Sequence, residues 1–449
     1  MKKHLVMVLL AIGTLVYMLL FTRGFVGLHS DSVAYLSAAE NIVAGRGLVI
    51  YRLFENSTPL SSFPFLYPIL LAPFRSIPLF GVFLLNSLSF FIFSYSLFNI
   101  VKILLKDSSK LKSTILYVLV IVGAPILYAY TMALTEPLFL AAVFFLLWLI
   151  LEGKLEDKRF VVVALLSSLL PLLRYAGVFV WLFVGGILLV QADSLKLKLK
   201  YIALYSLSCV PLLLWFIYLR SLGAESRQLV SEPLTFDFLV VAAKTMWMWV
   251  FPTGTLGLGV GGVFLVAVAY YTYLNLKNYN RVPIILIWFF ASYILFIIAS
   301  YAFFDRAIAS DFQRILTPLF PIVIMLVGAA LFSIRNIGAK RVGILIFSVM
   351  VVSIHIVAGS KQVQYGPPLS YRIWQKSDLV SYVKENREKF YFISNAWEPL
   401  YVYANVYVDR IPVKGQEKRD KNVEYFEKAL NKDRPLVFVF AKITQRLII

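Results

Sequence analysis

Long apolar runs separated by short polar connections recur along almost the whole chain. The first run, Leu5–Phe21, follows two lysines and lacks a small-residue cleavage site at its end, which predicts a retained helix rather than a removed signal. A membrane-spanning helix needs roughly 20 apolar residues. The pattern therefore predicts an all-α polytopic membrane protein with about eleven transmembrane helices. The further runs lie at about 79–101, 114–133, 137–151, 160–173, 176–190, 201–219, 256–276, 283–303, 315–333 and 342–358.

The connections between the runs alternate in charge. With the N-terminus in the cytoplasm, every short connection on the inner side is basic, as the positive-inside rule requires. This alternation predicts a cytoplasmic N-terminus, most simply in a plasma membrane, and a chain that ends outside the cell. The basic residues concerned are Lys102, Lys106, Lys110, Lys112, Lys154, Lys158, Arg159, Lys196, Lys198, Lys200, Lys277, Arg281, Arg335, Lys340 and Arg341.

Composition supports lipid as the main solvent. Hydrophobic residues make up 60% of the chain and charged residues 15%, with a mean hydropathy of +0.80; a soluble domain is about 25% charged. The formal net charge of +19 comes largely from those short connections, so it predicts topology control and no nucleic-acid partner. One cysteine and three histidines exclude an internal disulfide framework and a Cys- or His-based zinc cluster.

Three longer polar pieces fall on the outer side: the loop 22–78, a loop at about 220–255, and the tail 360–449. The tail predicts a small extracytoplasmic α/β domain, joined to a transmembrane domain of residues 1–359 through Gly366-Pro367-Pro368. Its predicted elements are a helix at Asp378–Lys389, strands at Phe390–Ile393 and Leu400–Tyr407, a helix at Val423–Leu430 and a strand at Leu436–Phe440.

The first outer loop carries the residues with the clearest chemistry. Asp31 precedes a predicted amphipathic helix, Ala34–Ala44, and the segment Phe63–Phe74 is apolar, too short to span and interrupted by three prolines. We expect both helices to lie in the outer interface. A carboxylate held there can take a proton from an acceptor hydroxyl, but Asp is also a favoured helix N-cap.

Further polar residues are predicted at the outer face. Glu136, in Thr135-Glu136-Pro137, positions an acceptor or shares a divalent cation (Mg or Mn) with Asp31, or it caps a helix that begins with proline. Arg174 binds an anion such as phosphate or extends to the lipid headgroups. His29 shares a proton network with Asp31 or is merely hydrated.

The remaining candidates are two tyrosines and a charged pair. Tyr35 and Tyr67, in the first loop, are predicted to line a sugar pocket, whereas most of the other aromatic residues, 16% of the chain in all, are predicted to belong to interfacial belts. Asp311 and Arg314 precede the tenth run, where they form an ion pair or contact substrate.

The first loop also resembles that of a known superfamily. The segment HSDSVAYLSAAENIVAGRGL, followed by FPFLYPILLAP, is similar to the first loop of the GT-C glycosyltransferases, and most of all to their protein mannosyltransferase and aminoarabinose transferase branch. The matching pattern is Asp-x3-Tyr-x2-Ala-Ala, Gly-x-Gly and Pro-x2-Tyr-Pro. It departs from many members at Ser32, where they have Glu, and at Phe63, where they have Lys or His.

The resemblance implies a GT-C-like fold and a sugar donor linked to polyprenyl or dolichyl phosphate. It implies that Asp31 is the catalytic base or orients the acceptor. The later segment DFQRILTPLFP resembles an Arg-Tyr-x3-Pro-x2-Pro segment of the superfamily, which implies that Arg314 neutralises the donor phosphate.

The predicted function is therefore an inverting hexosyl or pentosyl transfer on the outer side of the membrane, with a protein, lipid or glycan as acceptor and no certain cofactor. The chain has neither a Walker A motif nor a dinucleotide glycine fingerprint, which argues against a nucleotide-sugar donor. The alternative is a membrane transporter or lipid flippase. Such proteins are often built from internal repeats with charged residues at mid-membrane, and the sequence shows neither feature.

Overall fold

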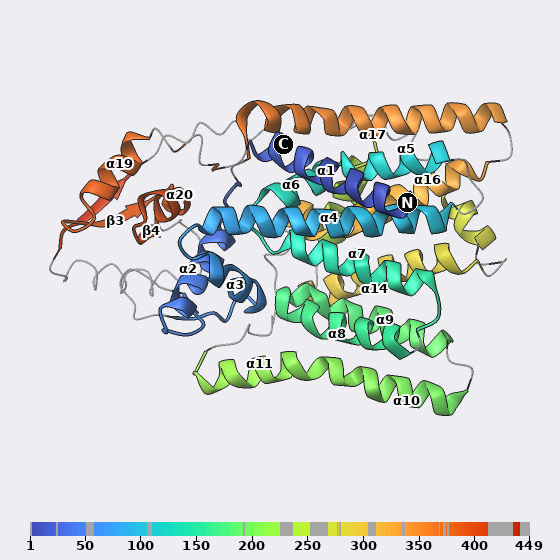
Figure 1. Cartoon of the computed structure of the whole chain (residues 1–449), viewed down its shortest axis with the longest axis horizontal. Coiled ribbons are helices and arrows are strands. Elements are labelled where there is room, and N and C mark those ends of the chain that lie inside the picture. Colours follow the sequence, from blue (N-terminus) through green and yellow to red (C-terminus); the bar gives the residue numbers. More distant parts are fainter. Residues whose placement is uncertain are drawn as a thin grey trace.

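The fold is a bundle of apolar helices with smaller elements gathered at one end (Figure 1). It is described from a computed structural model that covers residues 2–23, 26–50, 58–105, 110–155, 157–191, 194–224, 237–251, 268–275, 277, 280–303, 311–334, 337–367, 369–370, 374, 377–411 and 434–440. The bundle helices are α1 (Lys2–Thr22), α4 (Pro78–Leu104), α5 (Lys110–Ile121), α6 (Ala124–Thr131), α7 (Glu136–Glu152), α8 (Asp157–Leu173), α9 (Phe179–Gln191), α10 (Leu195–Ser206), α11 (Val210–Ser221), α12 (Asp237–Met248), α14 (Arg281–Phe303), α16 (Leu319–Phe332) and α17 (Ile337–Tyr365).

Apart from α12, which lies in the predicted outer loop at about 220–255, the bundle helices fall where the apolar runs predict them, and the protein is an integral membrane protein. Within the described residues, five helices are long and apolar enough to cross a bilayer, and the bent pair α5 and α6 would be a sixth. Two further apolar helices, Tyr175–Gln191 and Leu319–Phe332, are shorter. The total of about eleven spans stays a prediction, since most of the run at 256–276 lies outside the described residues.

Aromatic side chains fill the middle of the bundle. Phe144 of α7 lies between Phe93 of α4 and Phe289 of α14, with ring centroids 5.0 and 6.3 Å apart. All three rings are fully buried. By contrast, apolar residues such as Leu213 and Ile217 of α11 are more than half exposed, as expected for a face that contacts lipid.

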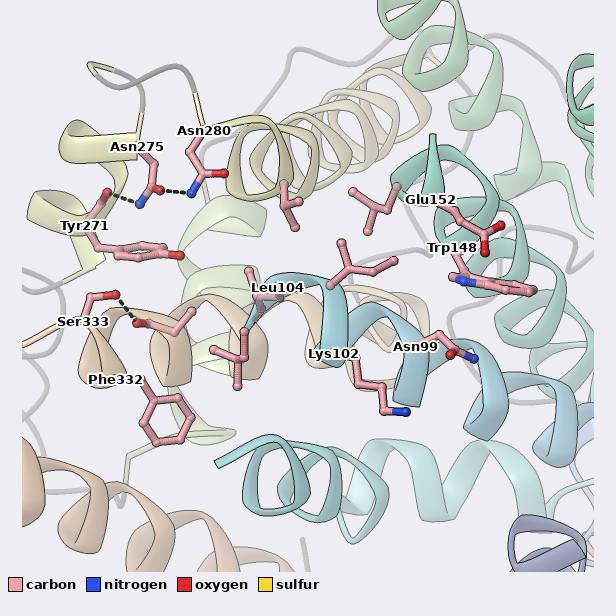
Figure 2. A pocket seen from close by; sticks show the side chains of 15 residues that line it. Asn99, Lys102, Leu104, Trp148, Glu152, Tyr271, Asn275, Asn280, Phe332 and Ser333 are labelled. Atoms are coloured by element: carbon pink, nitrogen blue, oxygen red, sulfur yellow. Dashed lines mark hydrogen bonds between the residues drawn. The ribbon is translucent and has the colours of Figure 1, made fainter. Parts of the chain in front are cut away.

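The ends of several helices meet at the end of the bundle that carries the basic connections. Arg281 donates to the carbonyl oxygens of Ile150 (3.0 Å) and Gly153 (2.7 Å), and the Lys112 ammonium lies 5.8 Å from the centroid of the Phe332 ring. A cavity of about 860 Å³ opens there between α4, α7, α14 and α16 (Figure 2). The charge alternation predicted this gathering at one end; the compartment that this end faces stays a prediction.

At the other end, called here the α2 end, the two predicted interfacial helices are present. They are α2 (Ser30–Val43) and α3 (Leu66–Leu71), the latter continued by η1 (Ala72–Phe74). A two-stranded hairpin, β1 (Val49–Ile50) with β2 (Thr58–Pro59), belongs to the same loop.

The C-terminal part forms a small parallel sheet beyond the α2 end (Figure 1). The strands β3 (Tyr391–Ser394), β4 (Val408–Arg410) and β5 (Leu436–Val439) have the order β4-β3-β5, and α19 (Asp378–Glu385) packs on them. The predicted helix at Val423–Leu430 lies outside the described residues, and the division of the chain at residue 360 stays a prediction.

The predicted strand at Leu400–Tyr407 is wrong. The structure has α20 (Trp397–Pro399) followed by a π-helical turn, η5 (Leu400–Ala404). Leu400 and Ala404 are both fully buried, whereas Val402 between them is only partly buried, as are Tyr401 and Tyr403. A strand with Leu400 and Ala404 on its buried face would bury Val402 as well. Asn405, with a left-handed φ of 53°, ends the turn before β4 begins.

Candidate active site

Hydrogen bonds hold two segments together at the α2 end, one leading to Asp31 and the other to Glu136. Gly27 donates its N–H to the Thr131 carbonyl and accepts from the Ala133 N–H, both at 2.8 Å, in a short parallel bridge. The buried Asn86 side chain of α4 donates to the carbonyls of Tyr130 (3.0 Å) and Met132 (2.9 Å). The approach to Asp31 and the approach to Glu136 are therefore held side by side.

Asp31 lies inside the first turn of α2 and does not cap it. The N-cap is His29: its Nδ1 accepts from the Asp31 backbone N–H at 3.4 Å, and the Ser32 hydroxyl accepts from the His29 N–H at 2.9 Å. The interpretation of Asp31 as an N-cap is thus wrong. Because His29 takes that role, the Asp31 carboxylate is available for other partners.

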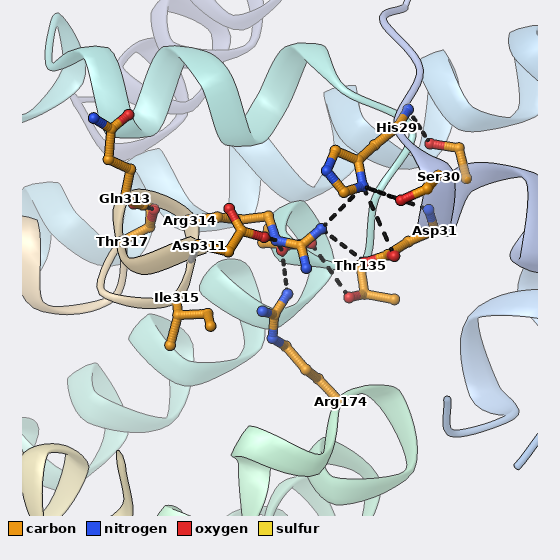
Figure 3. Close-up of polar contacts among 12 residues, drawn as sticks. His29, Ser30, Asp31, Thr135, Arg174, Asp311, Gln313, Arg314, Ile315 and Thr317 are labelled. Carbon is orange, nitrogen blue, oxygen red and sulfur yellow. Dashed lines mark hydrogen bonds and ion pairs between the residues drawn. The ribbon is translucent and has the colours of Figure 1, made fainter. Parts of the chain in front are cut away.

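Arg314 lies at the centre of the site and contacts three carboxylates (Figure 3). It is carried by the short helix α15 (Phe312–Ile315). Its NH1 donates to Asp31 Oδ2 at 2.7 Å, and its Nε lies 2.8 Å from Asp311 Oδ2 and 3.1 Å from Glu136 Oε1. The Arg314 guanidinium also lies 3.4 Å from His29 Nδ1. His29 and Asp31 therefore lie close together, as predicted.

Glu136 joins the two arginines. It is the first residue of α7 and only 4% exposed, and it makes a close ion pair with Arg174, which precedes the short helix η2 (Tyr175–Val178). The interpretations in which Glu136 only caps α7 and Arg174 extends to the lipid headgroups are therefore wrong. The N-terminus of α7 adds a favourable dipole for the Glu136 carboxylate.

Among the residues that the structure describes, the charges of this cluster do not balance. The ionised side chains of Asp31, Glu136 and Asp311 supply three negative charges, and those of Arg174 and Arg314 supply two positive ones. Glu136 Oε1 and Arg314 Nε are within ion-pair distance but lack a well-aligned hydrogen bond among the described residues. Arg314 Nε is thus held mainly by charge, whereas NH1 makes a hydrogen bond to Asp31.

The pKa values of two acidic groups in the cluster, Asp31 and Asp311, are shifted in opposite directions. Burial by itself raises the pKa of Asp31, but the contact with His29 and the positive charge of Arg314 outweigh burial and hold that pKa well below its usual range. Burial raises the pKa of Asp311, and here the charge of Arg314 offsets the effect only in part. Asp31 is therefore the stronger acid and is ionised at neutral pH.

The residues present do not fit a divalent cation. No group of three or more His, Cys, Asp or Glu side chains in the described part of the chain could hold a metal ion. Arg314 contacts both Asp31 and Glu136, the two predicted ligands, and so occupies the position that a shared cation would need.

Tyr35 and Tyr67 are buried within the first loop. Their rings pack edge to face with centroids 5.1 Å apart, and Tyr35 also packs on Phe63 at 5.0 Å. These contacts hold α2 against α3. The Tyr67 hydroxyl finds no hydrogen-bond partner among the described residues, so its predicted contact with a sugar stays open as a prediction.

Asn86 is the residue of this region that the sequence analysis did not single out. A polar side chain in the middle of an apolar run is a signal in its own right, because an amide in lipid needs a partner. The run at 79–101 contains two asparagines, however, and the sequence does not show that Asn86 rather than Asn99 faces the turn before Glu136.

Comparison with known proteins gives a structural likeness and no sequence match. No protein-family model matches the chain, and no curated protein matches it. The structure of ArnT from Cupriavidus metallidurans in the apo state aligns over 98% of this chain and 94% of that one, with a TM-score of 0.63 and 12% identity. The same protein bound to undecaprenyl phosphate aligns over 96% and 89%, with a TM-score of 0.58 and 11% identity. The chain therefore has the fold of ArnT, in agreement with the resemblance of its first loop to the aminoarabinose transferase branch.

Proposed function

We propose that this protein transfers a sugar from a polyprenyl-phosphate donor to an acceptor, with its active site at the α2 end and on the outer side of the membrane. The contact that carries this proposal is the 2.7 Å pairing of the Asp31 carboxylate with the Arg314 guanidinium. It supports the proposal because a carboxylate that can accept a proton lies next to a cation that can bind a phosphate. The shared fold supports the proposal, since ArnT has been solved with undecaprenyl phosphate bound.

In this mechanism the donor phosphate replaces carboxylates around Arg314. The NH1 and Nε donors that contact Asp31 and Asp311 turn to the phosphate oxygens, because a guanidinium binds phosphate with the same planar donor geometry. This exchange neutralises the leaving group and leaves Asp31 free to accept a proton. Arg314 thus acts by stabilising charge that develops in the transition state.

The transfer step then balances as a single displacement. The acceptor hydroxyl loses its proton to Asp31 while its oxygen bonds to the anomeric carbon of the sugar. The bond from that carbon to the phosphate oxygen breaks, and its electron pair leaves on the phosphate. Attack opposite the leaving group inverts the anomeric configuration, and one carboxylate suffices.

Glu136 and Arg174 serve as positioning residues in this scheme. Arg174 compensates the buried Glu136 carboxylate, which in turn lies 3.1 Å from Arg314 Nε. The pair fixes the side of the site on which the Arg314 guanidinium lies. Positioning of this kind matters because a displacement of about 1 Å can cost about 10²-fold in rate.

The experiment that tests the proposal is a transfer assay with the full-length protein in lipid. Radiolabelled sugars on polyprenyl phosphate are presented with peptide, lipid and glycan acceptors, and Asp31→Asn is assayed in parallel. The proposal is supported if the wild type transfers sugar with inversion of the anomeric configuration and Asp31→Asn does not transfer it. If folded protein shows no sugar release with any donor, the proposal is wrong and the transporter or flippase alternative takes its place.

A further inference from the structure

A second contact reaches α2 from the C-terminal part of the chain. Tyr401, in the turn η5, donates its hydroxyl to Glu40 Oε2 of α2 at 3.3 Å. The same hydroxyl contacts the side chain of Ser37. Ser37 and Glu40 are three residues apart and share one face of the helix, so a single phenol holds two positions of α2.

The segment around Tyr401 is firmly placed on the bundle. Tyr401, Val402 and Tyr403 pack against the main hydrophobic core, although the sheet to which their segment leads has a core of its own. Tyr403 donates to the Leu369 carbonyl at 3.3 Å. The turn η5 is thus braced against the chain that follows α17, and Tyr401 extends from this brace to α2.

These contacts make α2 an element that is held at two places. Asp31 is bonded to Arg314 near the start of the helix, and Glu40 is bonded to Tyr401 nine residues later, about 13 Å along the axis. A carboxylate lies about 5–6 Å from the axis of its helix, so a rotation of about 10° moves it by about 1 Å. Displacements of that size alter rates strongly.

We infer that Tyr401 is a positioning residue for the Asp31 carboxylate, acting through Ser37 and Glu40 on the rotation of α2. The inference rests on the proposed function for its effect on rate, but its effect on the helix is independent of that function. It gives the C-terminal segment a role in setting the geometry of the site. Without the hydroxyl, α2 keeps its packing on α3 and its contact at Arg314 but loses a polar contact that limits its rotation.

The test compares Tyr401→Phe with a matched variant, Tyr403→Phe, which removes from the same turn a hydroxyl that donates to the Leu369 carbonyl. Each protein is assayed in lipid for kcat, for KM of the polyprenyl-phosphate donor, and for amide hydrogen exchange in peptides covering residues 30–36. For Tyr401→Phe we expect kcat to fall about tenfold, KM to stay within about twofold, and exchange at the start of α2 to rise. Tyr403→Phe weakens the brace but keeps the contact between Tyr401 and α2, so it is expected to change all three measurements less than Tyr401→Phe does.

A combined variant separates positioning from a general loss of stability. Glu40→Ala together with Tyr401→Phe should lower kcat no further than Tyr401→Phe alone, because both changes remove the same contact. Equal losses in the two tyrosine variants, or unchanged exchange in α2, would overturn the inference. If the wild type has no transferase activity, the proposed function fails, and the exchange measurement still decides the role of Tyr401.

Discussion

Replacing Asp31 by Asn should abolish transfer and at the same time strengthen the binding of polyprenyl phosphate. The two effects have one origin, since Asp31 is both the proposed base and a competitor for Arg314, whose NH1 it contacts at 2.7 Å. A positioned general base contributes about 10² to 10⁴ in rate. Asparagine keeps the shape of the side chain but cannot accept the proton.

The gain in phosphate affinity follows from the charges. Two opposite charges about 4 Å apart attract by about 4 kcal/mol at an effective dielectric constant of about 20, and the side chains of Asp31 and Arg314 are only 18% and 13% exposed. Asparagine still offers an oxygen to Arg314, so only part of this attraction disappears. We expect a net gain of about 1–2 kcal/mol, or about five- to thirtyfold tighter binding of the phosphate.

Asp311→Asn is the matched control for this prediction. Asp311 also contacts Arg314, at 2.8 Å, and its removal should likewise tighten phosphate binding, but the base remains and measurable transfer should persist. Affinity is measured by titrating polyprenyl phosphate into protein in nanodiscs and rate by the transfer assay. Weaker phosphate binding in Asp31→Asn, or transfer that survives in it, would refute the assignment of both roles.

Three further predictions address the rest of the cluster. Arg314→Ala should weaken binding of the polyprenyl-phosphate donor by about tenfold or more and change the acceptor KM less; equal effects on both would contradict a phosphate role. Arg174→Met should leave the Glu136 carboxylate buried without its closest partner and destabilise the fold by about 3–5 kcal/mol, with stability largely restored by Arg174→Met combined with Glu136→Gln in thermal unfolding. Because the pKa of Asp31 is lowered in the fold, its ionised form stabilises the protein above the ordinary Asp pKa, and this contribution is lost as the pH falls through the lower folded value. Transfer should therefore stay constant from about pH 7 to about pH 5, and in Arg314→Gln any residual activity should be lost at a higher pH, since burial then raises the pKa of Asp31 with less charge to oppose it.

The helices could be predicted from the sequence because lipid imposes their length and apolar character. Each run outside 256–276 coincides with a helix or with a pair of helices. The run at 114–133 was predicted as one span because its hydropathy is continuous, although Pro125 within it is a signal for a break between α5 and α6. The 55° bend occurs at Gly123 and Ala124-Pro125, where the ring of Phe320 occupies the space that a side chain at Gly123 would need.

In the C-terminal part, two strands were predicted correctly from short apolar runs in the sequence. The strands at Tyr391–Ser394 and Leu436–Val439 are short apolar runs in the sequence and in the structure. The segment after Trp397 is equally apolar and rich in Tyr and Val, which favours a strand by composition. In the structure Leu400 and Ala404 are fully buried while Val402 between them is only partly buried, a burial pattern set by tertiary packing that composition does not contain.

The candidate residues at the α2 end were predicted one by one, each with a structural alternative beside its functional interpretation. The ion pairs between residues far apart in the sequence decide between the structural and the functional interpretation of each residue. Asp31 and Arg314, for example, are 283 residues apart, and only the fold brings them together. A charge near the membrane surface must find a partner or reach water, so acids and arginines predicted at one end of the bundle are expected to meet. The sequence does not show which pairs form, because the assignment depends on the bridge at Gly27 and the turn held by Asn86. Once His29 takes the cap of α2 and Arg174 takes Glu136, the excess of one carboxylate leaves Arg314 shared among three acids. This sharing, together with a buried Nε that lacks an aligned acceptor among the described residues, is the basis of the proposal that Arg314 exchanges one carboxylate for the donor phosphate.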